Sequence, residues 1–268
     1  MNRGLYAACS AMLVQETNLD VTANNLANVD TMGFRRRISA NAEFSALMDR
    51  LEKVSEDDET KIVTVPPFTM NWKGKQVIGG MALANVYSES HMDTRPGAVR
   101  TTDNPLDVAI DGPGFFAVQD GAGSVHYTRQ GNFQIGSDGN LVTLDGLVLQ
   151  GDGGPIAVEE ASSVKILSNG QVLVDGEVAA QIPLYTFENP TYLQQRGRSE
   201  LIANGDAGEP VNVENVRLLE GALEMSNVSV VEEMVRMIEA QRAYEGASKA
   251  LMAHDEQTGK LISSYGRQ

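Results

Sequence analysis

The sequence predicts an α+β fold, in which N- and C-terminal helices pair as a coiled-coil-like domain and the chain between them forms a central, mainly β domain with antiparallel strands. Two observations carry this prediction. Apolar residues recur at intervals of seven at both ends of the chain, and short alternating apolar runs separated by tight-turn dipeptides fill its middle. The first pattern is typical of helices that face a helical partner, and the second of consecutive antiparallel strands.

An apolar stripe predicts the N-terminal helix. Its members are Leu5, Met12, Leu19 and Leu26. A spacing of seven keeps one narrow side of a helix facing a partner, so we expect a helix from about Asn2 to Val29. It should end before Gly33, because glycine readily adopts the left-handed conformation that stops many helices.

A matching stripe predicts a long C-terminal helix, from roughly Ser226 to Tyr265. Its members are Val230, Met237, Tyr244, Leu251, Thr258 and Tyr265. We expect a second row beside it, made of Met234, Gln241, Ser248 and Ile262, with Arg242 exposed. Chain ends usually fray unless something holds them, so the two terminal helices are expected to meet.

The chain between the helices divides into two parts. Residues 34–96 are expected to be strands or loop around the acidic residues 56–59, because Pro66, Pro67 and several glycines break any long helix. Residues 97–217 are expected to form the β domain. The predicted organisation is therefore 1–33 for the N-terminal helix, 34–96 for the connecting segment, 97–217 for the β domain and 218–268 for the C-terminal helix.

Turn signals divide the β domain into hairpins. Asn169-Gly170 and Asp175-Gly176 separate short apolar runs, and Ser137 to Asn140 makes another turn. Asparagine, aspartate and glycine tolerate the positive φ angles that tight hairpins demand, so consecutive antiparallel strands are predicted here.

Composition and charge exclude several classes of partner. A net charge of -15 argues against binding to nucleic acid or to anionic membranes, because proteins bind these polyanions through clustered Lys and Arg. Arg35, Arg36 and Arg37 form the only dense basic run. We interpret this run as a solvated helix exit or a subunit-contact patch.

Direct insertion into a membrane is not expected either, because no apolar run approaches the length that crosses a bilayer. The apolar stretch from Leu5 to Val14 follows Arg3 but is cut short by polar residues. We therefore expect secretion, if it occurs, to use a pathway without a cleaved leader.

No constellation of residues predicts catalysis. The three histidines, His91, His126 and His254, lie in differently patterned regions without metal-type spacing. The single cysteine, Cys9, falls within the N-terminal heptad, where a cysteine is usually an apolar filler. The sequence thus predicts a protein that is not an enzyme, with no catalytic residue, cofactor or metal site.

Three runs resemble one known family. The run from Ala23 to Phe34, ANNLANVDTMGF, resembles the N-terminal signature of bacterial flagellar rod and hook proteins. The run from Leu223 to Glu245 looks like their C-terminal signature, and Asn104 to Gly112 with Gly114-Phe115-Phe116 looks like their entry into the β domain. The chain length resembles that of a rod protein more than the longer hook protein. The resemblance leaves proximal and distal rod types open, with a slight preference for the proximal type.

The resemblance implies a non-enzymatic structural subunit of the flagellar basal body, without cofactors. Such subunits build the rod that crosses the periplasm, with terminal helices in the inner core of a tube and the β domain outside. The implied partners are the protein itself, other rod and hook proteins, and the flagellar type III export apparatus.

The expected assembly interface lies on the two terminal helices. Its residues are Leu5, Met12, Leu19, Asn24, Asn25, Leu26, Asn28, Met234, Met237, Gln241, Tyr244 and Leu251. Asn24 and Asn28 either fix the register between subunits or ease the helix toward its end. Gly33 and Phe34 are the expected turn or hinge, with Phe34 either anchoring the turn or serving as ordinary local core.

Two other classes remain open from the residues alone. The chain could be a secreted β-rich binding module or hydrolase with a coiled-coil oligomerisation region. It could also be a soluble coiled-coil adaptor, which would form a closed dimer.

Overall fold

A computed structural model describes residues 3–43, 63–65, 68–70, 85–158, 163–213 and 216–265. The chain forms two compact units. One contains Met1–Ala23, Ser39–Ser90 and Met234–Gln268, and the other contains Asn24–Ile38 and His91–Glu233.

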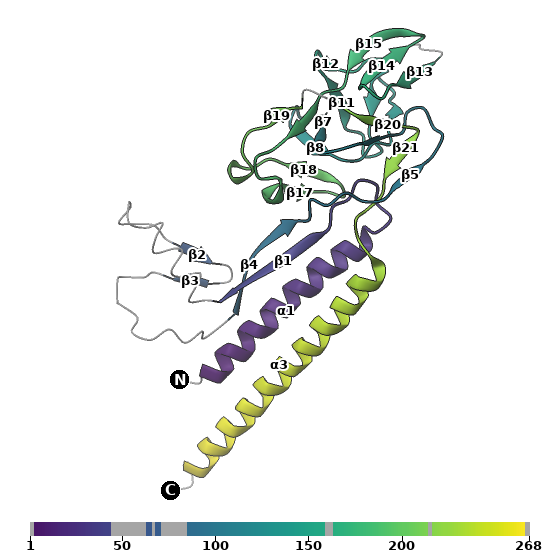
Figure 1. Ribbon diagram of the computed structural model, residues 1–268. Helices are drawn as coiled ribbons and strands as arrows, with labels where there is room; N and C mark the ends of the chain where they lie inside the picture. The colour runs from purple at the N-terminus through teal and green to yellow at the C-terminus, as the bar shows by residue number, and fades with distance from the viewer. Residues whose placement is uncertain are drawn as a thin grey trace. The chain divides into compact units, whose positions relative to one another are not determined.

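Two antiparallel helices dominate the first unit (Figure 1). Helix α1 spans Arg3–Ala27 and helix α3 spans Val230–Tyr265, and the two lie side by side. The predicted pairing of terminal helices is therefore confirmed, with ends within a few residues of those expected. Gly4 of α1 lies against the ring of His254 of α3, and a Cβ placed on Gly4 would be 2.4 Å from His254 Nε2. The two helices therefore approach closely at this point.

Two short strand pairs follow α1. Strands β1 (Arg37–Glu43) and β4 (Asn85–Met92) form one pair, and β2 (Val63–Val65) and β3 (Phe68–Met70) form the other. Strand β1 is tied to α1, since the hydroxyl of Ser39 donates to Asn18 Oδ1 at 2.7 Å. The expected acidic stretch at 56–59 lies outside the described residues.

A β domain fills the second unit, and its strands are short. They are β5 (Val99–Thr101), β6 (Val108–Ile110), β7 (Phe115–Gln119), β8 (Val125–Thr128), β9 (Gln134–Ile135), β10 (Leu141–Val142), β11 (Val148–Gly151), β12 (Gly154–Pro155), β13 (Val164–Ile166), β14 (Gln171–Val174), β15 (Glu177–Gln181), β16 (Leu184–Thr186), β17 (Gln194–Arg196), β18 (Glu200–Ile202), β19 (Val211–Asn212), β20 (Leu218–Glu220) and β21 (Ala222–Glu224). Two turns of 3-10 helix span Pro190–Tyr192 and Gly205–Ala207.

The strands pair antiparallel, as predicted. The largest sheet has the order β17-β18-β8-β7-β11-β10-β9, and β12, β16 and β19 extend it to ten strands. Strands β13, β14 and β15 form a second sheet. Strands β5 and β6 each pair with a late strand, β21 and β20 respectively, so the chain closes the domain just before α3 begins.

The tight turns form where the dipeptides predicted them. Asp175 and Gly176 join β14 to β15 with φ values of 51° and 91°, the positive pair that a two-residue hairpin of type I′ needs. Gly170 (φ 83°) ends the turn between β13 and β14, and Gly139 (φ 72°) lies in the turn between β9 and β10.

Apolar side chains from both sheets form the core. The larger cluster is centred on Phe116, which packs edge-on against Phe133 with ring centroids 5.2 Å apart. A second, aromatic cluster joins Phe115, Tyr127 and Phe187. In the described part of the chain, no helix combines the length and apolar character needed to cross a membrane.

Gly131 provides a test of the packing of the β domain. A Cβ at this position would lie 1.7 Å from the backbone oxygen of Val108, and backbone cannot move aside as a flexible side chain can. Gly131→Ala should therefore lower the free energy of unfolding by about 1–3 kcal/mol or more, measured by urea titration with circular dichroism.

Gly121→Ala is the matched control, since nothing lies within 4 Å of a Cβ placed there. Equal stability of the two variants would contradict the close approach between Gly131 and Val108.

Candidate functional site

The seam between the helices is built from one side of α3. We call the α1-facing residues of α3 the seam; they form two rows, Met237, Tyr244 and Leu251 in the first and Ala240, Ala247 and His254 in the second. Ala240 is buried, with 7% exposure, and the others are half-buried. The predicted first row therefore lies at this contact.

Met234 and Gln241 of the predicted second row are exposed in the subunit, and the residue buried beside the first row is Ala240. The expected role of Met234 and Gln241 at an interface between subunits stays a prediction. The closest approach of the two helices lies elsewhere, where Gly4 leaves room for the ring of His254.

Helix α1 is covered on two sides. Its predicted stripe, Leu5, Met12, Leu19 and Leu26, is half-buried throughout. Val14 is buried one turn before Asn18, which bonds to β1, so this side of α1 faces the strand. Contacts on two sides leave a third side of α1 open.

Apolar side chains occupy the open sides of both helices. On α1, Tyr6, Cys9 and Leu13 are exposed at a spacing of three and four residues, and we call them the outer row of α1. On α3, the outer face consists of Val231, Met234, Val235, Ile238 and Met252, which are 49–72% exposed. Exposed apolar rows of this kind mark surfaces that bind another protein.

Asparagines hold the end of α1. Asn25 is buried and forms a pair of hydrogen bonds with the backbone of Arg37, at 2.8 and 2.9 Å. Its amide also donates to Glu233 Oε2 at 3.2 Å, joining the end of α1 to the first turn of α3. Asn28 donates to the Asn24 carbonyl at 2.9 Å, which satisfies the helix end, and Asn24 is exposed.

The arginine run is buried, so its interpretation as a solvated exit or contact patch is wrong. Arg35 and Arg36 are 5% and 6% exposed. Arg35 pairs with Glu224 at 2.7 Å, and Arg129 pairs with the other oxygen of the same carboxylate at 3.1 Å. We call Arg35, Arg36, Arg129, Glu224 and Glu233 the neck cluster.

Within the neck cluster, Arg36 lies close to the acidic residue Glu233, and it also lies close to Asp93. Its guanidinium lies 3.7 Å from Glu233 and 3.9 Å from Asp93. Its backbone N–H donates to Asn227 Oδ1 at 2.7 Å, and the Asn227 amide donates in turn to the Arg95 carbonyl at 2.9 Å. The segments before β1, after β4 and before α3 are therefore connected side by side.

Burial sets the energetics of the neck cluster. Burial lowers the pKa of Arg129 to about 10, against the opposing effect of the Glu224 charge, so Arg129 still carries its charge at neutral pH. Burial also lowers the pKa of Arg35, again opposed by Glu224. The carboxylate of Glu224 is therefore needed for stability, because removing it would leave the buried guanidinium groups of Arg35 and Arg129 without a counter-charge.

Gly33 and Phe34 form a fixed turn beside this cluster. Gly33 has a φ of 68°, and its N–H donates to the Glu224 carbonyl at 2.8 Å. Its missing side chain is required, since a Cβ would lie 2.5 Å from the backbone of Arg129. Phe34 is 1% exposed, so it anchors the turn in the interior of the unit.

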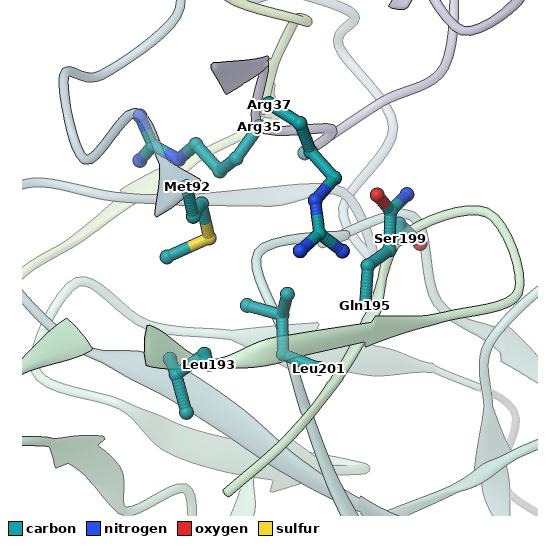
Figure 2. A pocket seen from close by; sticks show the side chains of 8 residues that line it. Arg35, Arg37, Met92, Leu193, Gln195, Ser199 and Leu201 are labelled. Carbon is teal, nitrogen blue, oxygen red and sulfur yellow. The ribbon is translucent and has the colours of Figure 1, made fainter. Parts of the chain in front are cut away.

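A small pocket next to the turn is shown in Figure 2. Its lining residues are Gly33, Arg35, Arg37, Met92, Leu193, Gln195, Ser199 and Leu201. Arg37 extends toward Gln195 and Leu201. The volume of about 10 Å³ holds roughly one water molecule, so this pocket offers no space for a substrate.

The histidines have local partners. The ring of His91 packs edge-on against Tyr192, His126 Nε2 lies 3.3 Å from Asp120 Oδ2, and His254 faces Gly4. Among the described residues, no group of three His, Cys, Asp or Glu side chains is arranged to hold a metal ion.

Three protein-family profiles match the chain. Residues 5–35 match the flagella basal body rod protein family, residues 109–174 match the flagellar hook protein FlgE/F/G D1 domain, and residues 219–264 match the flagellar basal body rod FlgEFG protein C-terminal family. The rod protein FlgG of Borreliella burgdorferi is 36% identical, over 100% of both chains. The chain belongs to the flagellar basal-body rod protein family.

Other rod proteins extend this similarity. FlgG of Caulobacter vibrioides is 35% identical over 95% of this chain and 96% of its own, and FlgF of Salmonella typhimurium is 30% identical over 97% of both. Family membership places this rod protein in the rod of the flagellar basal body. The terminal matches cover most of α1 and α3 together with Arg35, Glu224 and Glu233.

The neck cluster gives a direct mutational test. Glu224→Gln should lower the free energy of unfolding by about 3–5 kcal/mol, because it leaves Arg35 and Arg129 buried without a counter-charge. Urea titration of the full chain measures this loss.

Glu220→Gln is the matched control on the adjacent strand β20. Its ion pair with Lys165 is partly exposed, so the change should be below about 1 kcal/mol. A Glu224→Gln variant as stable as Glu220→Gln would show that the neck cluster does not hold the unit together.

Proposed function

We propose that this rod protein is a structural subunit that self-assembles through its terminal helices into the tubular drive shaft linking the motor to the hook. The observation that carries the proposal is the outer face of α3, where Val231, Ile238 and Met252 stay 72%, 52% and 57% exposed. A helix that keeps large apolar side chains in water has lower free energy once a neighbouring subunit covers them.

The partners are further copies of this chain and the other rod and hook proteins. The terminal helices pack into the inner core of the tube, and the β domain forms the outer layer. Head-to-tail contacts that do not close into a ring generate a helical tube, so the contacts between copies are heterologous. The flagellar type III export apparatus carries the subunit across the periplasm to the growing end.

The β domain supports the assembly without chemistry of its own. Its core and hairpins are complete within the subunit, so it keeps its shape while the helices exchange partners. The proposed role is mechanical, and no catalytic step is assigned to this rod protein.

A charge on the outer face of α3 should block assembly. Ile238→Lys lies at an exposed position, so the change in subunit stability should stay within about 0.5 kcal/mol, whereas burying the lysine between subunits is costly. Cells that carry only this variant should lose at least nine-tenths of their motility, and electron microscopy should show basal bodies without a complete rod.

Leu144→Lys is the control, because Leu144 is at least as exposed as Ile238, 62% against 52%, but lies in the β domain. Deletion of residues 234–268, which keeps Glu233 of the neck cluster, should abolish rods while the β domain still folds. Complete flagella in the deletion strain would overturn the proposed function.

A further inference from the structure

Helix α3 continues well beyond the point where α1 begins. Gly4 lies against His254, and α1 begins one residue earlier, at Arg3. Helix α3 runs on to Tyr265, and at a rise of 1.5 Å per residue the remaining part extends by about 16 Å. We call residues 255–265 the overhang.

The overhang carries the seam onward. Leu261 follows His254 by seven residues, so it continues the second row of the seam, and Thr258 follows Leu251 in the first row. Ile262 follows Leu261 in the sequence and lies beside the seam, in the heptad row of the exposed Gln241. The pattern that faces α1 earlier in the helix is thus repeated past the start of α1.

Cover is lost along this seam. Ala240 is 7% exposed and His254 is half-buried, whereas Leu261 and Ile262 are 59% and 69% exposed. Along the second row, burial is therefore lost from Ala240, where α1 accompanies α3, to Leu261, beyond the start of α1. Continuity with the α1 contact indicates that the missing cover is another α1.

The outer row of α1 fits this requirement. Tyr6, Cys9 and Leu13 span one heptad on α1, and Tyr6 and Leu13 are exposed in the subunit. Leu261 and Ile262 are the exposed apolar side chains of the overhang. Both sets lie near the same end of the helix pair, so one molecule carries two open apolar surfaces that can cover each other between copies.

We propose that the overhang of one copy packs, through Leu261 and Ile262, on the outer row of α1 of the next copy. This inference rests on the proposed function and names the contact that propagates it. The two surfaces differ, so each copy contacts one neighbour through its overhang and another neighbour through its outer row of α1. The series of contacts therefore continues without closing.

Native Cys9 makes the contact measurable. It is the only cysteine of the chain and is exposed. In the register set by Gly4 and His254, Cys9 lies level with residue 249 of its own α3, so it is about 20 Å along the helix axis from Ile262. A disulfide needs Cα atoms within about 7 Å, so a bond between Cys9 and a cysteine at 262 must join two copies.

The experiment introduces Ile262→Cys and oxidises purified basal bodies with copper phenanthroline, which takes up the two electrons released by the thiols. We expect a ladder of covalently joined subunits on a non-reducing gel, lost on reduction. Adding Cys9→Ser should reduce the ladder at least tenfold, and Leu144→Cys with native Cys9 should give none.

A second variant covers the case in which the cysteine alters assembly. Leu261→Asp should lower the yield of rods at least tenfold with unchanged helix content by circular dichroism, whereas Leu144→Asp should assemble normally. Rods that form without the Cys9-dependent ladder, or that form normally with Leu261→Asp, overturn this contact and leave the proposed function standing. Failure of the proposed function would instead appear as complete flagella in the deletion strain.

Discussion

The carboxylate of Glu224 lies between the guanidinium groups of Arg35 and Arg129, and all three side chains are shielded from water. Each comes from a different part of the chain: Arg35 follows α1, Arg129 follows β8, and Glu224 ends the last strand before α3. A buried ion pair contributes little net stability, but losing one partner is costly. The neck cluster therefore makes the ends of both helices and the β domain depend on one another, and the turn at Gly33 bonds to the same glutamate.

The neck cluster fixes one end of each helix and leaves the rest of the helix free to contact other subunits. The last turn of α1 and the first turn of α3 are fixed by buried polar groups, with Asn25 joining Glu233 and the backbone of Arg37. Beyond these turns α3 has one covered side and an apolar outer face, so its stability depends on packing partners rather than on helix propensity. A subunit anchored at the neck and open along its helices can keep its β domain intact while its helices take up neighbours.

Local patterns predicted the local structure. The heptad stripes located both helices, and Asp175-Gly176 formed the hairpin that its chemistry favours, because these signals depend only on nearby residues. The arginine run was misread because Glu224 and Glu233, its counter-charges, lie nearly two hundred residues later, and nothing local marks them as partners. The burial of Ala240 was not predicted for a similar reason, since a small residue looks unremarkable in a search for apolar stripes. Glu233 was likewise expected on a solvated face because it is acidic, whereas it lies on the buried side of α3.

Hydrogen exchange before and after assembly tests most directly the claim that the terminal helices make the contacts between subunits. Amides of α1 and α3 in the purified subunit should exchange far faster than those of β7 and β8, because few of the helical side chains are buried. In assembled rods, protection should rise by at least a hundredfold in the two helices and change little in the core strands. Full protection of both helices in the free subunit, or new protection confined to the β domain, would contradict this account.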